Sequence, residues 1–352
     1  MGKKKGKSIS NRRLLNWTVI LGVMFFITVL IGIVFFYVRI RFTQNIITSS
    51  DYKTYDNYYV IITGNSDTDY WKSIYAGAKA EAEKLSVNVE MMGEGLDKNL
   101  TKEDYLRIAI SSSVDGIIIE GDDDPEIQEL LAKADANGIP VVTVSEDSPS
   151  SGRKSFIGVS SNNMGKEYGN QIVEYANEVD ADSLSVMVLI DKGMTESSQT
   201  VIMTAIRESL VENGLSDKVS LDSKIVSSDV DYAAEEEIRD IFVGKEDIPD
   251  IMVCLSEQNT ICAYQTVVDH NKVGQVEIFG YYMSDTIRSA IKKDIIRSSI
   301  VVDTEELGLN AVKAIDEYKE SGYVSEIYLI DTKLANSDNI ASFNMEGGES
   351  DD

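Results

Sequence analysis

Residues 114–145, VDGIIIEGDDDPEIQELLAKADANGIPVVTVS, contain the pattern of a strand, a helix and a second strand in direct succession. The run GIIIE at 116–120 is typical of a buried strand, and residues 141–145 repeat the pattern. Between them, Asp124-Pro125-Glu126 predicts a helix start with a capping acid and a proline at its first position, and Asn137-Gly138 predicts its end. Strands joined through a helix in this way run parallel, so the stretch predicts an α/β fold.

The same alternation continues on both sides of this stretch. Apolar segments of about five residues alternate with amphipathic segments of about ten to fifteen residues, first over 58–159 and again over 164–280. Such strands are typical of parallel sheets that helices cover on both faces. Two successive runs of this kind predict two similar lobes. The length between residues 58 and 332 is sufficient for lobes with sizeable cores.

The N-terminal part has a different character, because residues 14–38 contain no charged side chain. A helix of this length spans roughly 37 Å, enough to cross a hydrocarbon core of about 30 Å, so we expect a transmembrane anchor. A cleaved signal peptide would have a shorter apolar core followed by small residues, whereas this core ends in Tyr37-Val38-Arg39. The segment also contains no cysteine to which a lipid could be attached.

Flanking charges predict the orientation of this anchor. The basic residues that precede it outnumber those that follow it closely; they are Lys3, Lys4, Lys5, Lys7, Arg12 and Arg13, against Arg39 and Arg41. We therefore expect residues 1–13 to be a cytoplasmic basic tail, and the body of the chain to lie in the extracellular or periplasmic space. Residues 39–57 are polar and predict a linker, and residues 336–352 predict an acidic, disordered tail.

Charge and cysteine content exclude several classes of protein. The chain has 33 basic and 59 acidic residues and a net charge of −26. Such a charge repels phosphate backbones, so nucleic-acid binding is excluded. Only Cys254 and Cys262 are present, which excludes a disulfide scaffold. We expect both to be buried thiols, with a bridge between them as the alternative.

Several short motifs, in this order and spacing, resemble the ribose- and galactose-binding proteins and the ligand-binding half of LacI-type repressors. The clearest are Val114-Asp115-Gly116-Ile117-Ile118-Ile119 and Asn137-Gly138-Ile139-Pro140-Val141-Val142. The others are residues 64–71 with the helix 74–82, Ile157-Gly158-Val159-Ser160-Ser161 with Gly165 and Gly169, and Ile278-Phe279-Gly280-Tyr281-Tyr282. This resemblance to type I periplasmic binding proteins implies two Rossmann-like lobes with parallel sheets, joined by a three-crossover hinge.

The resemblance also implies how the chain divides. Within a solute-binding domain at 58–335, lobe 1 takes about 58–160 and 303–330, and lobe 2 takes about 161–302. The hinge would lie at Ser160, Ser161, Tyr281 and Val302, and a small ligand would be enclosed between the lobes. A DNA-binding repressor is excluded because the apolar segment 14–38 occupies the place of its headpiece.

Candidate ligand-binding residues follow from the same comparison and from the rule that sites in such sheets lie beyond strand carboxyl ends. Tyr70 and Trp71 stand where two aromatic side chains stack on a sugar, although both could instead be core residues. Asp69 could accept bonds from ligand hydroxyls or cap the helix. The remaining candidates, all near the ends of expected strands, are Ser145, Glu146, Ser256, Glu257, Tyr282 and Asp303.

This sequence departs from the family at several of these positions. Tyr282 replaces the usual Asp, Val302 replaces a frequent Gln, and Ile202 stands where an Arg is expected. Three interpretations remain open: an ordinary sugar ligand, a cationic or amine-bearing ligand favoured by carboxylates beside aromatic faces, or a degenerate pocket.

Sequence motifs for catalysis or metal binding are lacking. There is no phosphate-binding glycine loop, zinc-ligand cluster or nucleophile elbow, and His270 is the only histidine. The acidic loop 121–124 lacks the spacing of an EF-hand. We therefore expect a protein that is not an enzyme and has no cofactor or metal. The resemblance to periplasmic binding proteins implies the partner: an ABC permease to which the protein delivers ligand or, alternatively, a membrane histidine kinase for which it is a sensory co-receptor.

Overall fold

The computed structural model describes residues 21–24, 26–37, 54–95, 100–180, 182–227, 232–243 and 248–343. The chain divides into two compact units, residues 1–54 and 55–352. In the first unit, residues 21–24 and 26–37 are helical. Among the helices that can be described, none is both long and apolar enough to span a bilayer. The expected anchor at 14–38 lies partly outside the described residues.

The first lobe of the second unit is built on a six-stranded sheet in the order β11-β5-β4-β3-β1-β2. Every neighbouring pair in this sheet is parallel. Its strands are β1 (Asn57–Ile62), β2 (Val87–Met91), β3 (Gly116–Glu120), β4 (Val141–Val144), β5 (Ser155–Gly158) and β11 (Ile327–Leu329).

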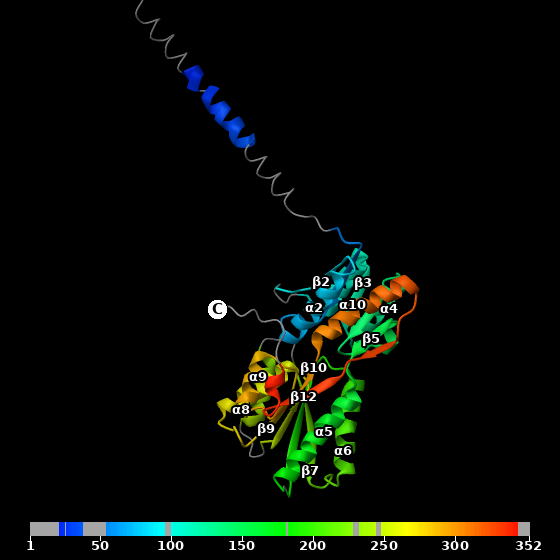
Figure 1. The fold of residues 1–352 in the computed structure, drawn as a ribbon, viewed down its shortest axis with the longest axis vertical. Coiled ribbons are helices and arrows are strands. Elements are labelled where there is room, and N and C mark those ends of the chain that lie inside the picture. The colour runs from blue at the N-terminus through cyan, green and yellow to red at the C-terminus, as the bar shows by residue number, and fades with distance from the viewer. Residues whose placement is uncertain are drawn as a thin grey trace, which may run out of the picture. The chain divides into compact units, whose positions relative to one another are not determined.

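Helices cover both faces of this sheet, as Figure 1 shows. Alternate side chains of β3 point to opposite faces, so Ile118 packs in the core beneath α2 (Asp69–Ala82) and α10 (Thr304–Ser321). Ile117 and Ile119 pack in a separate core beneath α3 (Lys102–Ser112) and α4 (Pro125–Ala136). This two-sided burial explains why the central strand is an uninterrupted isoleucine run.

The second lobe contains another six-stranded sheet, in the order β12-β10-β9-β8-β6-β7. It is parallel except for β12, which pairs antiparallel with β10. Its strands are β6 (Leu184–Asp191), β7 (Val219–Val226), β8 (Ile251–Cys254), β9 (Glu277–Tyr281), β10 (Ser298–Val302) and β12 (Thr332–Asn336). The expectation of two α/β lobes with predominantly parallel sheets is therefore confirmed.

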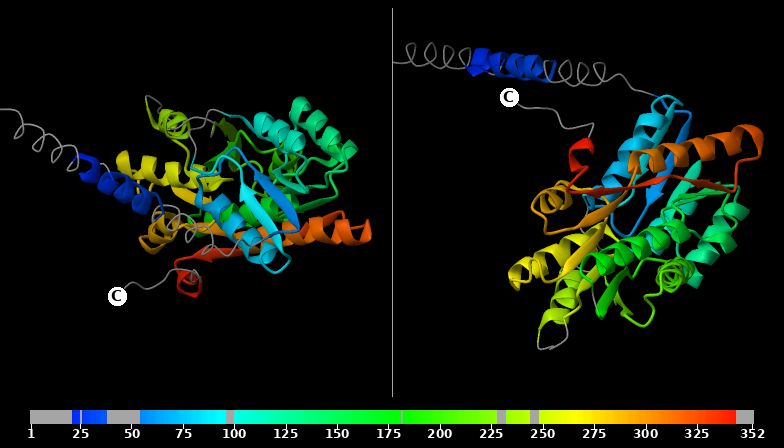
Figure 2. Two further views of the ribbon diagram at one scale, coloured as in Figure 1. Left: turned by 90° about the horizontal axis from the view of Figure 1, so that it is seen from above. Right: turned by 60° about the horizontal axis from the view of Figure 1, so that its bottom comes forward.

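The helices of the second lobe also divide between the two faces of its sheet (Figure 2). The α5 (Ser161–Glu178) and α6 (Glu196–Glu212) helices pack in the same continuous core as α2 and α10 of the first lobe. A separate core lies beneath α7 (Ala233–Phe242), α8 (Glu257–Asp269) and α9 (Asp285–Lys292). One core thus continues from lobe to lobe.

The chain passes between the two sheets three times, from β5 to α5, from β10 to α10, and from β11 to β12. Of the expected hinge residues, Ser160 caps α5 and Ser161 begins it, while Val302 ends β10. Tyr281 does not lie at a crossing, because it is the last residue of β9, within the second sheet. The third crossing, after Leu329, was not placed by the sequence.

The C-terminal segment differs in part from the expected disordered tail. Beyond Asn336, at the end of β12, a short 3-10 helix spans Ile340–Ser342. Ile340 is buried in the second-lobe core, because its side chain is apolar and reaches the cluster formed by α9 and its neighbours. Residues 344–352 lie outside the described part of the chain.

Candidate functional site

A cavity of about 80 Å³ lies between the two lobes. It is lined by loops and helix starts that follow strand carboxyl ends in both sheets. The lining residues from lobe 1 are Asn65, Thr68, Tyr70, Trp71, Glu120, Ser145 and Glu146; those from lobe 2 are Asp191, Gly193, Met194, Leu255, Ser256, Glu257, Gln258 and Tyr281. Of the nine predicted ligand-binding residues, six therefore line one cavity: Tyr70, Trp71, Ser145, Glu146, Ser256 and Glu257.

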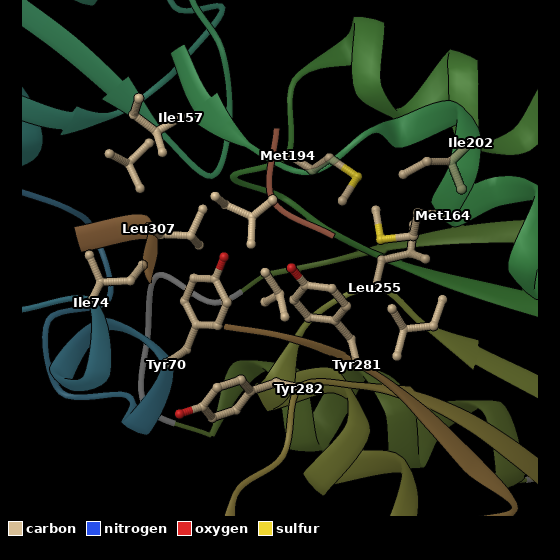
Figure 3. Close-up of a cluster of buried hydrophobic side chains, with 14 of the residues drawn as sticks. Tyr70, Ile74, Ile157, Met164, Met194, Ile202, Leu255, Tyr281, Tyr282 and Leu307 are labelled. Carbon is tan, nitrogen blue, oxygen red and sulfur yellow. The ribbon is translucent and has the colours of Figure 1, made fainter. Parts of the chain in front are cut away.

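Tyr70 lies at the centre of this interface. Its ring makes an edge contact with Trp71, with centroids 6.0 Å apart, and contacts Tyr281 and Tyr282 of the other lobe at 6.0 and 5.3 Å. Figure 3 shows the hydroxyl groups of Tyr70 and Tyr281 turned to the same side, while that of Tyr282 points away. Tyr70 and Trp71 are both buried, so they belong to the core as well as to the cavity wall.

Ser145 turns the chain sharply after β4. Its φ of 69° is in the left-handed region, and its Oγ lies 3.0 Å from the Tyr70 hydroxyl. Tyr282 takes a similar conformation after β9, with φ of 71°. Positive φ is uncommon for residues other than glycine. Both lobes thus use a constrained turn at the cleft.

Glu146 joins the lobes directly. Its Oε2 accepts hydrogen bonds from the backbone N–H (3.2 Å) and the hydroxyl (2.7 Å) of Thr195, the residue that caps α6 in lobe 2. Burial raises the pKa of Glu146 to about 7, although the bonds from Thr195 oppose this shift and the charge of Glu120 adds to it.

Glu257 makes the corresponding connection from lobe 2. It is the first residue of α8, with Ser256 as the cap, and its Oε2 accepts a 3.0 Å bond from the Tyr70 backbone N–H. Its side chain is buried, and this burial raises its pKa to about 7 despite that bond. Two carboxylates from opposite lobes therefore hold the cleft together in this structure.

Two further acidic residues of the cavity were missed by the sequence analysis. Glu120 ends β3 and accepts bonds from the Thr63 hydroxyl (2.9 Å) and the Gly64 N–H (3.3 Å); burial raises its pKa. Asp191 ends β6 and accepts a 2.8 Å bond from the Gly193 N–H. Both lie at strand carboxyl ends, so applying that rule to every strand would have found them.

Three predicted ligand-binding residues do not line the cavity. Asp69 is exposed, and the cap of α2 is Thr68, whose side chain accepts from the Trp71 N–H. Tyr282 packs against the ring of Tyr70, and its hydroxyl donates a 3.2 Å hydrogen bond to the Asp69 carbonyl. Asp303 is the cap of α10 and accepts from the Glu306 N–H at 2.9 Å. None of these three side chains therefore contributes to the cavity wall.

The cysteines and the histidine do not line the cavity. Cys254 and Cys262 are free and buried, and His270 ends α8, with its Nδ1 2.9 Å from the Thr266 carbonyl. Across the described ranges, no group of three or more His, Cys, Asp or Glu residues has the arrangement of a metal site. The cavity itself offers hydrogen-bond acceptors, hydroxyl groups and aromatic faces, which suit the reversible binding of a small polar molecule.

The comparison with family models gives one match, described as periplasmic binding protein domain, over residues 58–322. That range extends from β1 to the end of α10, so it includes the strands of both sheets other than β11 and β12. Among curated proteins, no relative matches the chain.

Solved structures with this fold include GanP, a glucose-galactose binding protein from Geobacillus stearothermophilus. It is 21% identical, with a TM-score of 0.70, over 80% of this chain and 98% of that chain. An ABC transporter solute-binding protein from Burkholderia graminis C4D1M, in complex with D-arabinose, is 17% identical with a TM-score of 0.71, over 82% and 98%. A XylFII–LytSN complex matches at 24% identity and a TM-score of 0.66, over 80% and 98%.

Proposed function

This chain belongs to the periplasmic binding protein family, in its type I sugar-binding group, and from this membership we propose that it binds a small sugar-like ligand outside the cytoplasm. The observation that carries the proposal is the cavity between the lobes, to which both sheets contribute strand carboxyl ends. A ligand held there contacts both lobes at once. It therefore stabilises the closed arrangement by its greater affinity for that state.

The proposal is tested by calorimetry of the full-length chain, purified in detergent, against glucose, galactose, arabinose and their amino derivatives. We expect saturable binding of at least one compound and a raised melting temperature in its presence, since a ligand that binds only the folded state stabilises it. No heat and no thermal shift with any of them at millimolar concentration would contradict the proposal.

We further propose that the N-terminal segment anchors the protein to a membrane, with the binding domain on the outer side. The helical residues 21–24 and 26–37 expose large apolar side chains, for example Leu21 (61%), Phe26 (67%) and Phe35 (66%). Lipid would remove this surface from water. The test is alkaline extraction of cell membranes: the full chain stays with the membranes, and a variant lacking residues 1–38 is released. Release of both variants would contradict the anchor.

The proposed partner is the permease of an ABC importer, to which the closed, ligand-bound form would deliver its ligand. The match to an ABC transporter solute-binding protein supports this role. A sensory co-receptor that presents the liganded form to a membrane histidine kinase is the second candidate, supported by the similarity to XylFII in its complex with LytSN.

Co-purification from mildly solubilised membranes distinguishes the two roles. Recovery of a permease and its ATPase in a ligand-dependent manner supports delivery, whereas recovery of a kinase supports sensing. The genes that adjoin the coding sequence provide an independent check.

A further inference from the structure

The charge of the interlobe cavity points to a particular class of ligand. We propose that the cavity binds a molecule about the size of one sugar ring that carries a protonated amine, held by Glu146 and Glu257 from opposite lobes. This inference rests on the proposed binding function and specifies the ligand.

All ionisable side chains of the cavity wall other than tyrosines are acidic. Four carboxylates line it, Glu120, Glu146, Asp191 and Glu257, and within the described part of the chain the lining contains no lysine, arginine or histidine. Burial raises the pKa of Glu120 and of Glu257, and two lysines outside the lining oppose this shift, Lys102 at Glu120 and Lys72 at Glu257. Lys102 also forms an ion pair with Asp122. An ammonium group would thus meet several acceptors and no cationic side chain among the described lining residues.

The four carboxylates of the cavity come from both lobes. Glu120 and Glu146 belong to lobe 1, whereas Asp191 and Glu257 belong to lobe 2. The charge of Asp191 raises the pKa of Glu120, and that of Glu120 raises the pKa of Glu146. A cation in the cavity would remove this repulsion, so an amine-bearing ligand favours closure more strongly than a neutral molecule of the same shape.

The aromatic walls and the size of the cavity define the rest of the ligand. Tyr70, Trp71 and Tyr281 line the cavity, and aromatic rings suit both the apolar face of a sugar ring and a cationic group. A volume of about 80 Å³ accommodates roughly five to eight waters. That is about the space of a single sugar ring.

Calorimetry on the full-length chain in detergent at pH 7.5 tests the amine directly. The probes are glucosamine and galactosamine, each compared with glucose, galactose and the neutral N-acetylated derivatives. We expect at least one amine to bind about tenfold more tightly than its neutral counterparts, and Glu146→Gln or Glu257→Gln to weaken it by about tenfold. The control is Glu208→Gln, an exposed position on α6 of lobe 2, which should bind like the unchanged chain.

The possible outcomes distinguish a failure of the amine assignment from a failure of the proposed binding function. Tighter binding of a neutral sugar than of its amine would overturn the assignment of an amine-bearing ligand and leave the binding function supported. No binding of either kind would overturn both. Melting curves of each variant show whether a loss of affinity comes from misfolding.

Proton release provides a second measurement. Because Glu146 and Glu257 have pKa values of about 7, each carries a proton in part of the free molecules near neutral pH. A cation that binds their ionised forms displaces these protons. Binding heats at pH 6.5 in two buffers of different ionisation enthalpy should therefore differ for the unchanged chain, and should agree for the Glu146→Gln, Glu257→Gln double variant. Equal heats for the unchanged chain would contradict the assignment.

Discussion

Glu146 and Glu257 link the lobes through hydrogen bonds that the ionised carboxylate accepts, yet burial at the cleft disfavours that ionised form. Their folded-state pKa values of about 7 lie above the ordinary value of 4.5. Between these values, the folded protein binds more protons than the unfolded chain. Stability in this window therefore decreases as the pH rises.

We accordingly expect the free energy of unfolding of the ligand-free protein to fall between pH 5 and pH 7.5, with the two glutamates contributing about 1–3 kcal/mol. The net charge adds its own pH dependence, so the informative quantity is the difference between the unchanged chain and the Glu146→Gln, Glu257→Gln variant in urea unfolding. The double variant should have a flatter profile, with Glu208→Gln as control. Parallel profiles would show that the two carboxylates do not carry this effect.

Tyr70 contributes mainly through its ring, which contacts aromatic residues of both lobes, and less through its hydroxyl, which contacts Ser145. Tyr70→Phe keeps the ring and should cost about 0.5–1.5 kcal/mol of unfolding free energy. Tyr70→Ala leaves a cavity in the shared core and should cost about 3–5 kcal/mol. Urea unfolding of the pair checks this order, and similar costs for both variants would argue against the ring as the main contributor.

At the residue level, the sequence predicted those site positions that directly follow a strand or begin a helix. Ser145, Glu146, Ser256 and Glu257 are of this kind, and all four line the cavity. Asp303 was misplaced because a short acidic side chain before a helix serves equally well as its cap, as it does here. The interlobe bonds of Glu146 and Glu257 depend on the relative placement of two lobes, which no local pattern encodes.

At the level of elements, two helices of lobe 1 approach closely at glycines. A Cβ atom added at Gly308 of α10 would lie 1.8 Å from the carbonyl oxygen of Ile74 in α2. A Cβ atom added at Gly77 of α2 would lie 2.0 Å from the carbonyl oxygen of Glu305 in α10. These distances are far below contact, so a side chain at either position would force the helices apart.

Gly308→Ala should therefore destabilise the protein by about 1–3 kcal/mol, despite the better helix propensity of alanine. Gly64→Ala is the control, because its Cβ would meet nothing within 4 Å, and we expect a change within about 0.5 kcal/mol. Thermal unfolding of both variants measures the difference. An unchanged stability of Gly308→Ala would mean that the helices do not pack this closely.

The strands within the two alternating runs were predictable, including the edge strands β2 and β7, whereas the edge strands β11 and β12, which follow α10, were not. β3 and β4 are buried on both faces and so have strong patterns, whereas Thr332–Asn336 (β12) is a mostly polar edge strand. β12 is held by its antiparallel pairing with β10 and by the burial of Ala335. Both are tertiary interactions, which a local sequence pattern does not contain.

At the scale of the whole molecule, one hydrophobic core extends from α2 and α10 of lobe 1 to α5 and α6 of lobe 2. Tyr70, Tyr281 and Tyr282 lie where this core meets the cleft (Figure 3). The three chain crossings are the connections about which the lobes would turn in the proposed closure. In the function proposed above, a ligand in the cavity would favour the closed arrangement.

The distance between the lobes is the most direct test of this account. Spin labels at Glu129→Cys on α4 and Glu208→Cys on α6, both exposed positions, would report this distance by pulsed electron–electron double resonance in the full-length chain. The native Cys254 and Cys262 are buried, so labelling is directed to the introduced cysteines. With the tightest ligand identified by calorimetry, we predict a broad distance distribution that narrows and shifts to shorter values at saturation. An identical distribution with and without saturating ligand would contradict closure of the lobes on a bound molecule.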